Sequence, residues 1–342
     1  MNIYNENGFL NIPVIAGAGA WLNVIISARQ RFGKTYGVLK YMLDNDITHI
    51  LLRRTTKEAE LISSSELLNP YRPLENYYRV GLFSNSKTTE ICDYTLKEDG
   101  KAEKGKLRGL LLSLPQVANI RGFNGASFTD VVFDEFIPEK GAYQRKTEGE
   151  ALLNAYVTIN GNRESAGLPP LRLWLLANAN NLSSPILEAL NLTNIIVNMQ
   201  RKKQDQYLKD GVCVILPMGN ALADWRTDTA LNRQIRKDSP FYQMSVDNTF
   251  SYDASPLIMN LPIKHMKPLF NYDGLLYAWE NDKGIYICHA PHNQNSYTNS
   301  KWDKAQLQSS YLWLKRYYYE GLVLFSDMYL LTIFRDIFDI EL

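Results

Sequence analysis

Alternation between apolar runs and polar loops is the clearest pattern in the chain. Short apolar runs lie at 22–26, 49–52, 131–133 and 171–176, and each of them ends in polar or charged residues. Apolar residues at helical spacing follow the first two runs. Buried runs of this length, separated by helices, are typical of a parallel sheet that is covered on both faces. The pattern therefore predicts an α/β domain with a mostly parallel sheet in residues 1–217.

Other parts of this N-terminal domain show different patterns. Residues 79–114 alternate between apolar and polar positions around a charged tip at 97–106, which is typical of a β-hairpin. A helix is predicted for 147–160, and short strands are predicted for 194–197 and 212–216.

The pattern changes after Pro217. Residues 218–254 are polar and contain scattered arginines, and we expect them to form a helical linker. In residues 255–342, two apolar runs at 275–279 and 284–288 flank the segment ENDK, which is a hairpin signal. With two helices and a short strand further on, residues 255–342 are predicted to form a small α+β domain.

Composition narrows the choice of class without selecting a function. The chain has 342 residues, of which 45% are hydrophobic and 21% are charged, as expected for a globular protein of two domains. The net charge of +1 excludes a general basic field, so contact with nucleic acid would depend on local patches. Three widely spaced cysteines favour a reducing compartment. The uncharged stretch 10–28 contains Pro, Gly and Asn, which argues against a membrane span.

The first apolar run leads into a polar loop that ends in Gly33, Lys34 and Thr35, and a helical pattern follows. Strand, loop and helix in this order are the context of a phosphate-binding P-loop. Backbone N–H groups of such a loop and of the helix N-terminus bind anionic oxygens. We expect Lys34 to reach the β- and γ-phosphates of ATP, and the Thr35 hydroxyl to ligate Mg²⁺.

The loop departs from the usual P-loop pattern because Ala28 stands five residues before Gly33, where a glycine is common. Ala tolerates fewer backbone conformations than Gly, so a somewhat different loop shape is expected. The residues expected to surround the nucleotide here are Ala28, Arg29, Gln30, Arg31, Phe32, Gly33, Lys34 and Thr35. Taken alone, the loop is also consistent with a strand-to-helix turn that binds no nucleotide.

The apolar run at 131–133 ends in two adjacent acids, Asp134 and Glu135. Carboxylates next to a buried strand are costly unless a cation or a reaction uses them. At this position of P-loop enzymes the first acid holds Mg²⁺, and a following Glu polarises the attacking water as general base. We therefore predict Asp134 as a metal ligand and Glu135 as a catalytic base. An ordinary strand end is the alternative.

Polar residues at two other strand ends extend the candidate site. The amide of Asn178 follows the run at 171–176 and can hydrogen-bond the γ-phosphate or the water, although Asn is also a common turn residue. A basic cluster of Arg53, Arg54 and Lys57 follows an earlier strand, at the edge where α/β sheets bind ligands. Contact with a phosphate backbone and a solvated turn are both consistent with this cluster.

With both nucleotide motifs placed, the chain resembles the DNA-packaging ATPases of small tailed bacteriophages, which are relatives of the large terminase subunits. The strings SARQRFGKT, LLRRTTKEAEL, VVFDEFIPEKG, ALLNAYVTINGNRE and LLANANNLSSP occur in the order of that family. The late string FNYDGLLYAWENDKGIYI resembles the family's C-terminal domain. The resemblance covers nearly the whole chain. It implies an ASCE-type P-loop ATPase domain followed by an RNase H-like domain.

The resemblance also implies partners and a place of action. Subunits of the family form a homo-oligomeric ring, a pentamer, at the portal of a procapsid. ATP hydrolysis moves double-stranded DNA into the preformed shell. The capsid portal (connector) protein and a structural RNA are further partners that the resemblance suggests. The expected location is the host cytoplasm, with transient docking at the portal vertex and no membrane contact.

The resemblance implies roles for several basic residues. A neighbouring subunit would supply an arginine finger, for which Arg163 is the best match and Arg145 a weaker one. The family is rich in arginine near this point, whereas this chain has Gly161. Arg54 and Lys57 match the region that faces the DNA channel.

Nuclease activity is not expected, because it requires several carboxylates converging on two metals. The run at 275–279 has no acid in its middle, Glu280 lies at its end, and Asp327 is the other acid near a predicted strand. Three alternatives remain: a two-activity large terminase with an active nuclease, a P-loop kinase of small molecules, and a ring subunit that binds nucleotide without catalysis. Glu135 argues against the kinase, which would exclude water.

Overall fold

The computed structural model divides the chain into two compact units. The structure describes residues 1–27, 32–85, 88–119, 125–137, 147–178, 184–217, 234, 257 and 261–340. The first unit comprises Met1–Asn181 and Lys202–Phe250, and the second comprises Leu182–Arg201 and Ser251–Leu342. Residues 182–201, which we expected within the ATPase domain, therefore group with the C-terminal residues. The predicted linker at 218–254 lies outside the described residues, except for position 234.

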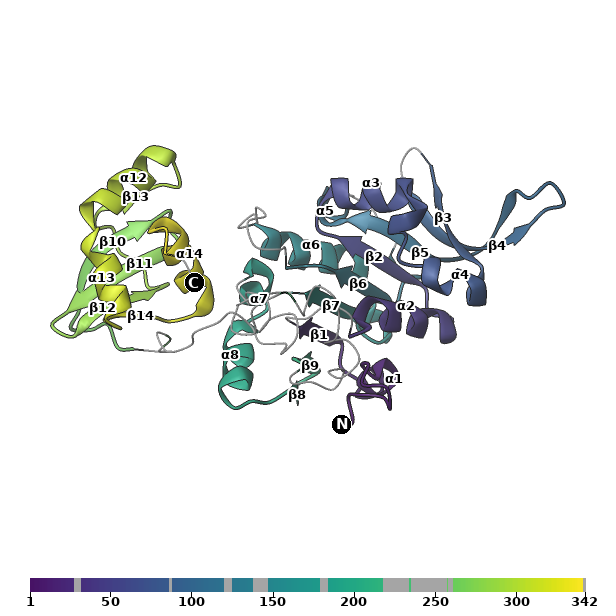
Figure 1. The fold of residues 1–342 in the computed structure, drawn as a ribbon, viewed down its shortest axis with the longest axis horizontal. Helices are drawn as coiled ribbons and strands as arrows, with labels where there is room; N and C mark the ends of the chain where they lie inside the picture. Colours follow the sequence, from purple (N-terminus) through teal and green to yellow (C-terminus); the bar gives the residue numbers. More distant parts are fainter. Residues whose placement is uncertain are drawn as a thin grey trace. The chain divides into compact units, whose positions relative to one another are not determined.

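A sheet of nine described strands forms the first unit (Figure 1). In sheet order the strands are β3 (Val80–Ser84), β4 (Thr89–Leu96), β5 (Ala102–Ser113), β2 (His49–Arg53), β6 (Asp130–Asp134), β7 (Arg172–Asn178), β1 (Leu22–Ser27), β9 (Val212–Ile215) and β8 (Gln206–Lys209). Neighbouring strands from β5 to β9 are parallel, and antiparallel partners extend the sheet at both edges. The predicted mostly parallel sheet is confirmed.

The central strands are buried along their whole length because both faces of the sheet are covered, and their inner positions are mostly apolar. All residues of β1, β2 and β6 are buried. Figure 1 shows α1, α2 and α4 on one side of the sheet, and α5 and α6 on the other. The helices of this unit are α1 (Ile12–Gly17), α2 (Lys34–Asp44), α3 (Thr56–Ser64), α4 (Arg72–Tyr78), α5 (Leu114–Asn119) and α6 (Glu148–Asn160), with 3₁₀ turns at Glu66–Leu68 and Glu164–Ala166.

Local sequence signals account for the start of α3. The Thr55 side chain accepts a hydrogen bond from the Glu58 N–H, and Glu58 bonds back to the Thr55 backbone. This reciprocal capping box satisfies N–H groups that have no partner within the helix. The helix therefore begins immediately after the basic end of β2, which fixes Arg53 and Arg54 at the edge of the sheet.

The second unit contains a five-stranded sheet of mixed direction. In sheet order its strands are β13 (Ser296–Tyr297), β10 (Lys267–Tyr272), β11 (Leu276–Asn281), β12 (Gly284–Cys288) and β14 (Val323–Phe325). The predicted hairpin is formed by β11 and β12, which are antiparallel, whereas β12 and β14 are parallel. The helices are α7 (Pro185–Ala189), α8 (Thr193–Arg201), α12 (Lys301–Ser310), α13 (Trp313–Tyr319) and α14 (Met328–Ile337). The α+β class predicted for this part is confirmed.

One predicted strand is wrong, because residues 194–197 belong to helix α8. Their short apolar run resembles a strand, but the buried positions Leu192, Ile196 and Met199 recur at helical spacing. Val197 joins the apolar core of the second unit, which explains why this helix groups with the C-terminal residues. Packing against the core of the second unit stabilises residues 194–197 as a helix. The apolar pattern of these four residues alone does not reveal this packing.

Cys92, Cys213 and Cys288 are free and buried. Within the described ranges, no helix combines the length and the apolar character that crossing a membrane requires.

Candidate nucleotide site

Four neighbouring parallel strands bring the candidate residues to one edge of the first sheet. Ser27 of β1 pairs with Asn178 of β7, and Asp134 of β6 pairs with Leu176 of β7. Because β2 and β6 are parallel and Leu52 pairs with Phe133, Arg53 lies level with Asp134. The carboxyl ends of parallel strands are the usual ligand-binding edge of α/β sheets. The candidate site is built there.

Lys34 is the first residue of α2 and is only 5% exposed. Gly33 precedes it with φ of 75°, a left-handed conformation that a residue with a side chain adopts at a cost. The ammonium donates hydrogen bonds to Ser27 Oγ at 2.6 Å and to Asn178 Oδ1. Burial lowers the pKa of Lys34 to about 8, although the charges of Asp134 and Glu135 oppose the shift. The lysine is thus held at the ends of β1 and β7.

Thr35 and Asp134 lie side by side, as the two motifs predict. The Thr35 hydroxyl donates to Asp134 Oδ1 at 2.9 Å. Burial raises the pKa of Asp134, and the charge of Arg53 only partly opposes this shift. The carboxylate therefore lies where additional positive charge would stabilise it.

Glu135 has a strained backbone and a shared partner. Its φ is 54°, which is uncommon for a residue other than Gly, Asn or Asp, and its side chain is 56% exposed. Arg53 Nη2 donates to Glu135 Oε2 at 2.7 Å, and Arg53 Nη1 donates to Asp134 Oδ2 at 2.8 Å. One guanidinium thus bridges both acids, and it holds Glu135 beside Asp134.

Arg54 and Lys57, predicted to face DNA, lie in different surroundings. The Arg54 side chain is 9% exposed, and it contacts Glu148 Oε1 at 3.1 Å and Glu58 Oε1 at 3.5 Å. These contacts join α3 to the first turn of α6. Lys57 is exposed in the first turn of α3. Of the two residues, Lys57 is the one whose side chain is accessible to a polyanion.

Arg163, the candidate arginine finger, is 7% exposed. Its guanidinium donates to the backbone carbonyls of Pro169, Ala126 and Phe128 at 3.0–3.1 Å. These bonds join the end of α6 to the segment before β6, so the structure does not bring Arg163 to the other candidate residues. Arg145 lies outside the described residues.

The remaining loop positions are only partly described. Ala28, Arg29, Gln30 and Arg31 lie outside the described residues. Phe32 is fully buried in the apolar core, so its side chain packs inward. Its carbonyl accepts a hydrogen bond from the Leu10 N–H, which connects the end of the loop to the segment before α1.

Two site residues, Ser27 and Arg53, were missed or misinterpreted from the sequence. Ser27 follows an apolar run as its last strand residue, and that position was the available signal. Arg53 was grouped with Arg54 and Lys57 as one basic cluster. Alternation along the strand end sends Arg53 and Arg54 in different directions, and only Arg53 reaches the acid pair.

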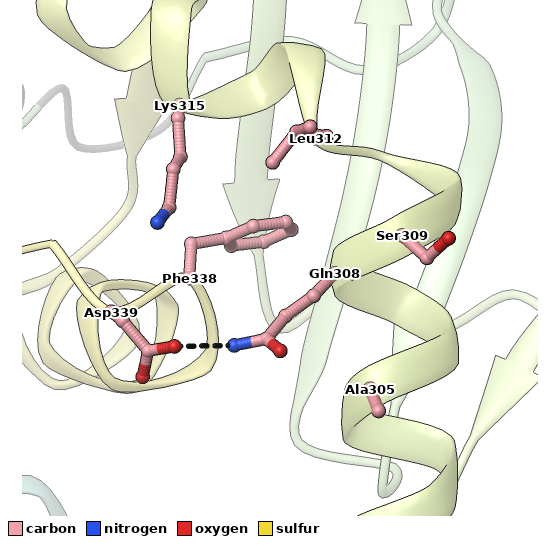
Figure 2. Close-up of a pocket in the computed structure, with 7 residues that line it drawn as sticks. All are labelled: Ala305, Gln308, Ser309, Leu312, Lys315, Phe338 and Asp339. Atoms are coloured by element: carbon pink, nitrogen blue, oxygen red, sulfur yellow. Dashed lines mark hydrogen bonds between the residues drawn. The ribbon is translucent and has the colours of Figure 1, made fainter.

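A groove in the second unit has a volume of about 300 Å³. Figure 2 shows the Phe338 ring at its centre and a hydrogen bond of 2.8 Å between Gln308 and Asp339. Its lining consists of Ala305, Gln308, Ser309, Leu312, Lys315, Phe338 and Asp339. None of these residues belongs to the strand ends that hold Lys34 and the acid pair, so this groove is not the candidate site.

The family is decided by a match over most of the sequence. Residues 4–304 match the model of the Podovirus DNA encapsidation protein (Gp16). The chain belongs to this family. Its function at the family level is packaging of a viral genome, as the motifs and the resemblance predicted. No curated protein matches the chain.

Two solved structures share the fold over nearly the whole length. The Phi-28 gp11 DNA packaging motor is 18% identical, with a TM-score of 0.57, and the match covers 98% of this chain and 100% of that one. The genome packaging motor assembly of bacteriophage Phi-29 is 21% identical, with a TM-score of 0.58, and the match covers 97% and 98%. Both likenesses extend through the C-terminal unit, which supports a shared two-part architecture.

Proposed function

We propose that this member of the encapsidation family hydrolyses ATP at the edge of its parallel sheet and uses the energy to move double-stranded DNA. The observation that carries the proposal is the convergence of Lys34, Thr35, Asp134, Glu135 and Arg53 at one set of strand ends. These side chains come from three separate parts of the sequence. Such a cluster of cations, acids and a helix N-terminus suits a triphosphate.

Lys34 binds the triphosphate in this proposal. Its ammonium donates to Ser27 and Asn178, and phosphate oxygens can replace these acceptors. An anionic ligand also favours the charged form of a buried lysine, whose pKa burial lowers. Asn178 is then free to contact the γ-phosphate or the attacking water.

The residues of the site fit Mg²⁺. The Thr35 hydroxyl and the Asp134 carboxylate are hard oxygen ligands, which Mg²⁺ prefers, and they lie 2.9 Å apart. Asp134 also has a raised pKa, which indicates a carboxylate whose burial is not fully compensated. When bound, Mg²⁺ would neutralise charge on the β- and γ-phosphates.

Glu135 accepts the proton of the attacking water as general base. The 2.7 Å contact with Arg53 restrains this side chain, so we expect the ion pair to loosen before Glu135 moves to the attacking water. Arg53 is thus a positioning residue that restrains the base until substrate and DNA are bound. A strained backbone at Glu135 is consistent with a group that has two positions.

The partners of the motor are proposed from the family and from charge. Lys57 is exposed on α3 and can contact a DNA phosphate, whereas a contact of Arg54 would require release from Glu148. The solved relative from Phi-29 is a motor assembly, and we propose a homo-oligomeric ring at the capsid portal for this chain. The proposed location is the host cytoplasm, with docking at the portal vertex.

ATP turnover with and without DNA tests the proposal. We expect Lys34→Ala to abolish turnover, because the ammonium that binds the triphosphate is lost. We expect Glu135→Gln to lower turnover by about 10²–10⁴-fold, the usual contribution of a general base, while nucleotide binding persists. Phosphate release and binding of a fluorescent ATP analogue are the measurements.

Matched variants serve as controls. Lys40 lies on the same helix and pairs with Asp44 on the surface, so Lys40→Ala should retain turnover. Glu60 is exposed on α3, so Glu60→Gln should do the same. Turnover that survives both Lys34→Ala and Glu135→Gln would show that hydrolysis occurs elsewhere or that the subunit is not catalytic.

An active nuclease is the second candidate function, and the C-terminal sheet argues against it. Among the described strands of this sheet, Glu280 of β11 is the one acidic residue. Within the described residues, the one cluster of potential metal ligands has two carboxylates and a histidine, fewer carboxylates than two-metal cleavage requires. We expect the purified chain to leave supercoiled DNA intact with Mg²⁺ or Mn²⁺. Nicking by the wild-type chain would favour the two-activity terminase.

A further inference from the structure

A cluster of His289, Glu188 and Asp327 in the second unit has no part in the nucleotide site. His289 Nε2 lies 2.9 Å from Asp327 Oδ2 and 3.5 Å from Glu188 Oε1, and the three ligand atoms lie within 4.8 Å of one another. Asp327 is buried, whereas the side chains of His289 and Glu188 are partly exposed. An ion from solution can therefore reach the cluster.

The sheet places two members of the cluster side by side. β12 and β14 are parallel, with Ile287 opposite Phe325, and His289 and Asp327 each follow two residues later. Both side chains thus leave the carboxyl ends of adjacent parallel strands, the edge at which α/β sheets commonly bind ligands. Glu188 comes from α7, which belongs to the same unit.

Each of the three side chains is also held by a second contact. Thr193 Oγ1 donates to Glu188 Oε2 at 3.1 Å, and the Leu330 N–H donates to Asp327 Oδ1 at 3.0 Å. The imidazole of His289 has a hydrogen bond to the backbone of Leu275. Outer contacts of this kind orient metal ligands, and for His the typical partner is a backbone carbonyl or a carboxylate.

We propose that Glu188, His289 and Asp327 bind one Zn²⁺ ion, with water at a fourth position, and that the ion fastens α7 to the C-terminal sheet. Ligand atoms of a tetrahedral zinc site lie about 3.4 Å apart, given Zn–N and Zn–O distances near 2.1 Å. The observed 2.9 Å and 3.5 Å lie on either side of this value. The His289–Glu188 distance thus fits a tetrahedral site, whereas His289 and Asp327 have to separate by about 0.5 Å.

Charge and ligand type favour zinc over a hard cation. A protonated His289 leaves one of the two carboxylates uncompensated, whereas Zn²⁺ with a neutral imidazole balances both. An imidazole nitrogen suits Zn²⁺, whereas Mg²⁺ and Ca²⁺ prefer oxygen ligands. The proposed ion is therefore structural and distinct from the Mg²⁺ of the nucleotide site.

The test uses the full chain after removal of metals with a chelator. Co²⁺, which reports tetrahedral coordination through its visible absorption, is titrated first, and Zn²⁺ is then added as a competitor. We expect one equivalent of Co²⁺ to bind with the tetrahedral spectrum and to be displaced by Zn²⁺. Zn²⁺ should also raise the melting temperature of the wild-type chain.

Variants separate a site from scattered surface binding. His289→Ala and Glu188→Gln should weaken Zn²⁺ binding by at least about 100-fold, the upper end of what second-shell changes cost. Asp327→Asn should also weaken Zn²⁺ binding, while the N-cap of α14 is retained because Asn caps helices well. His265 is exposed and lies outside the cluster, so His265→Ala should bind Zn²⁺ like the wild type.

Two outcomes would overturn the proposal. One is Co²⁺ or Zn²⁺ binding that is equally tight in the wild type and in folded His289→Ala. The other is a metal-dependent nicking activity that is lost in Asp327→Asn, since this would make the cluster part of a nuclease. Neither measurement depends on ATP turnover, so the metal site and the ATPase proposal succeed or fail separately.

Discussion

Two buried acids, Asp134 in the first unit and Asp327 in the second, follow short apolar strands and yet have opposite electrostatic surroundings. Burial raises the pKa of Asp134, because Arg53 and Lys34 compensate only part of its cost. Burial alone would also raise the pKa of Asp327, but hydrogen bonds from His289, the Leu330 N–H and Ser326 hold it below its usual range. The neighbours of the two acids differ as well: Glu135 follows Asp134, whereas Ser326 precedes Asp327 and donates to it.

The difference shows what marks a reactive strand end. Asp327 receives hydrogen bonds from Ser326 and from the Leu330 N–H of α14, pairs with His289 and caps α14, so its charge is stabilised by its own unit. Asp134 faces the start of another helix and shares its arginine with an exposed, strained Glu135. An acid whose charge is incompletely compensated, next to a second acid that can move, is suited to receive a cation and a substrate.

The largest expected effect is a loss of ATP turnover when Asp134, at a strand end of the first sheet, is replaced, compared with replacement of Glu280 in the second sheet. We expect Asp134→Asn to lower DNA-stimulated ATP turnover by at least about 100-fold, since a metal ligand supplies several kcal/mol of charge stabilisation. Glu280→Gln changes the acid of the C-terminal strands and should leave turnover unchanged. Equal losses in both variants would show that the two sheets share one reaction, which contradicts the contrast drawn above.

A second contrast lies between the adjacent residues Arg53 and Arg54. Arg54→Ala leaves Glu148 buried without this cation, and such a loss costs about 3 kcal/mol of unfolding free energy. The exposed Arg72 on α4 is the control, and Arg72→Ala should stay within about 0.5 kcal/mol of the wild type. Urea unfolding is the measurement. Unchanged stability together with weaker DNA binding would instead support the DNA-facing role that the resemblance implies for Arg54.

These contrasts show which parts of the fold and of the site could be predicted from the sequence. The P-loop and the acid pair could be placed together because parallel strands with helical connections bring their carboxyl ends to one edge. This argument needs only the order of elements, and the structure confirms it for β1, β6 and β7. The sequence predicted a contact of Asn178 with the γ-phosphate or the water, and in the structure its amide oxygen accepts from Lys34.

The partners of individual charges could not be predicted in this way. Arg53 and Arg54 are neighbours in the chain, but one meets Asp134 and the other meets Glu148, 94 residues away. Arg163 donates hydrogen bonds to the backbone carbonyls of Ala126 and Phe128. The positions of these carbonyls depend on the backbone conformation of the segment before β6. Glu188, His289 and Asp327 lie about a hundred and forty residues apart at most, and no spacing rule connects them. Long-range packing decides all of these contacts.

A smaller effect tests whether Arg53 restrains the base. Lys in place of Arg keeps one positive charge near Asp134 but cannot donate to both acids as the guanidinium does. The contact with the half-exposed Glu135 is worth at most about 1 kcal/mol, so Arg53→Lys should raise DNA-free turnover by up to about fivefold. DNA-stimulated turnover should rise less, because DNA has already released the restraint in the wild type.

The ratio of turnover with DNA to turnover without DNA is the quantity that decides this prediction. It should fall in Arg53→Lys and remain at the wild-type value in Arg72→Ala. If Arg53→Lys lowers both rates by the same factor, Arg53 serves only to stabilise the buried carboxylate of Asp134.

The smallest expected effect concerns Asp327, whose role in the metal-free chain is structural. Its Oδ1 accepts from the Leu330 N–H at the start of α14, and loss of such a cap costs about 1 kcal/mol. We expect Asp327→Ala to lower the unfolding free energy of the metal-free chain by this amount, and Asp327→Asn to lower it by less, because the amide oxygen can still accept. Urea unfolding in the presence of a chelator measures both. An Asn variant as unstable as the Ala variant would mean that the charge of Asp327, through His289, stabilises this unit more than the cap does.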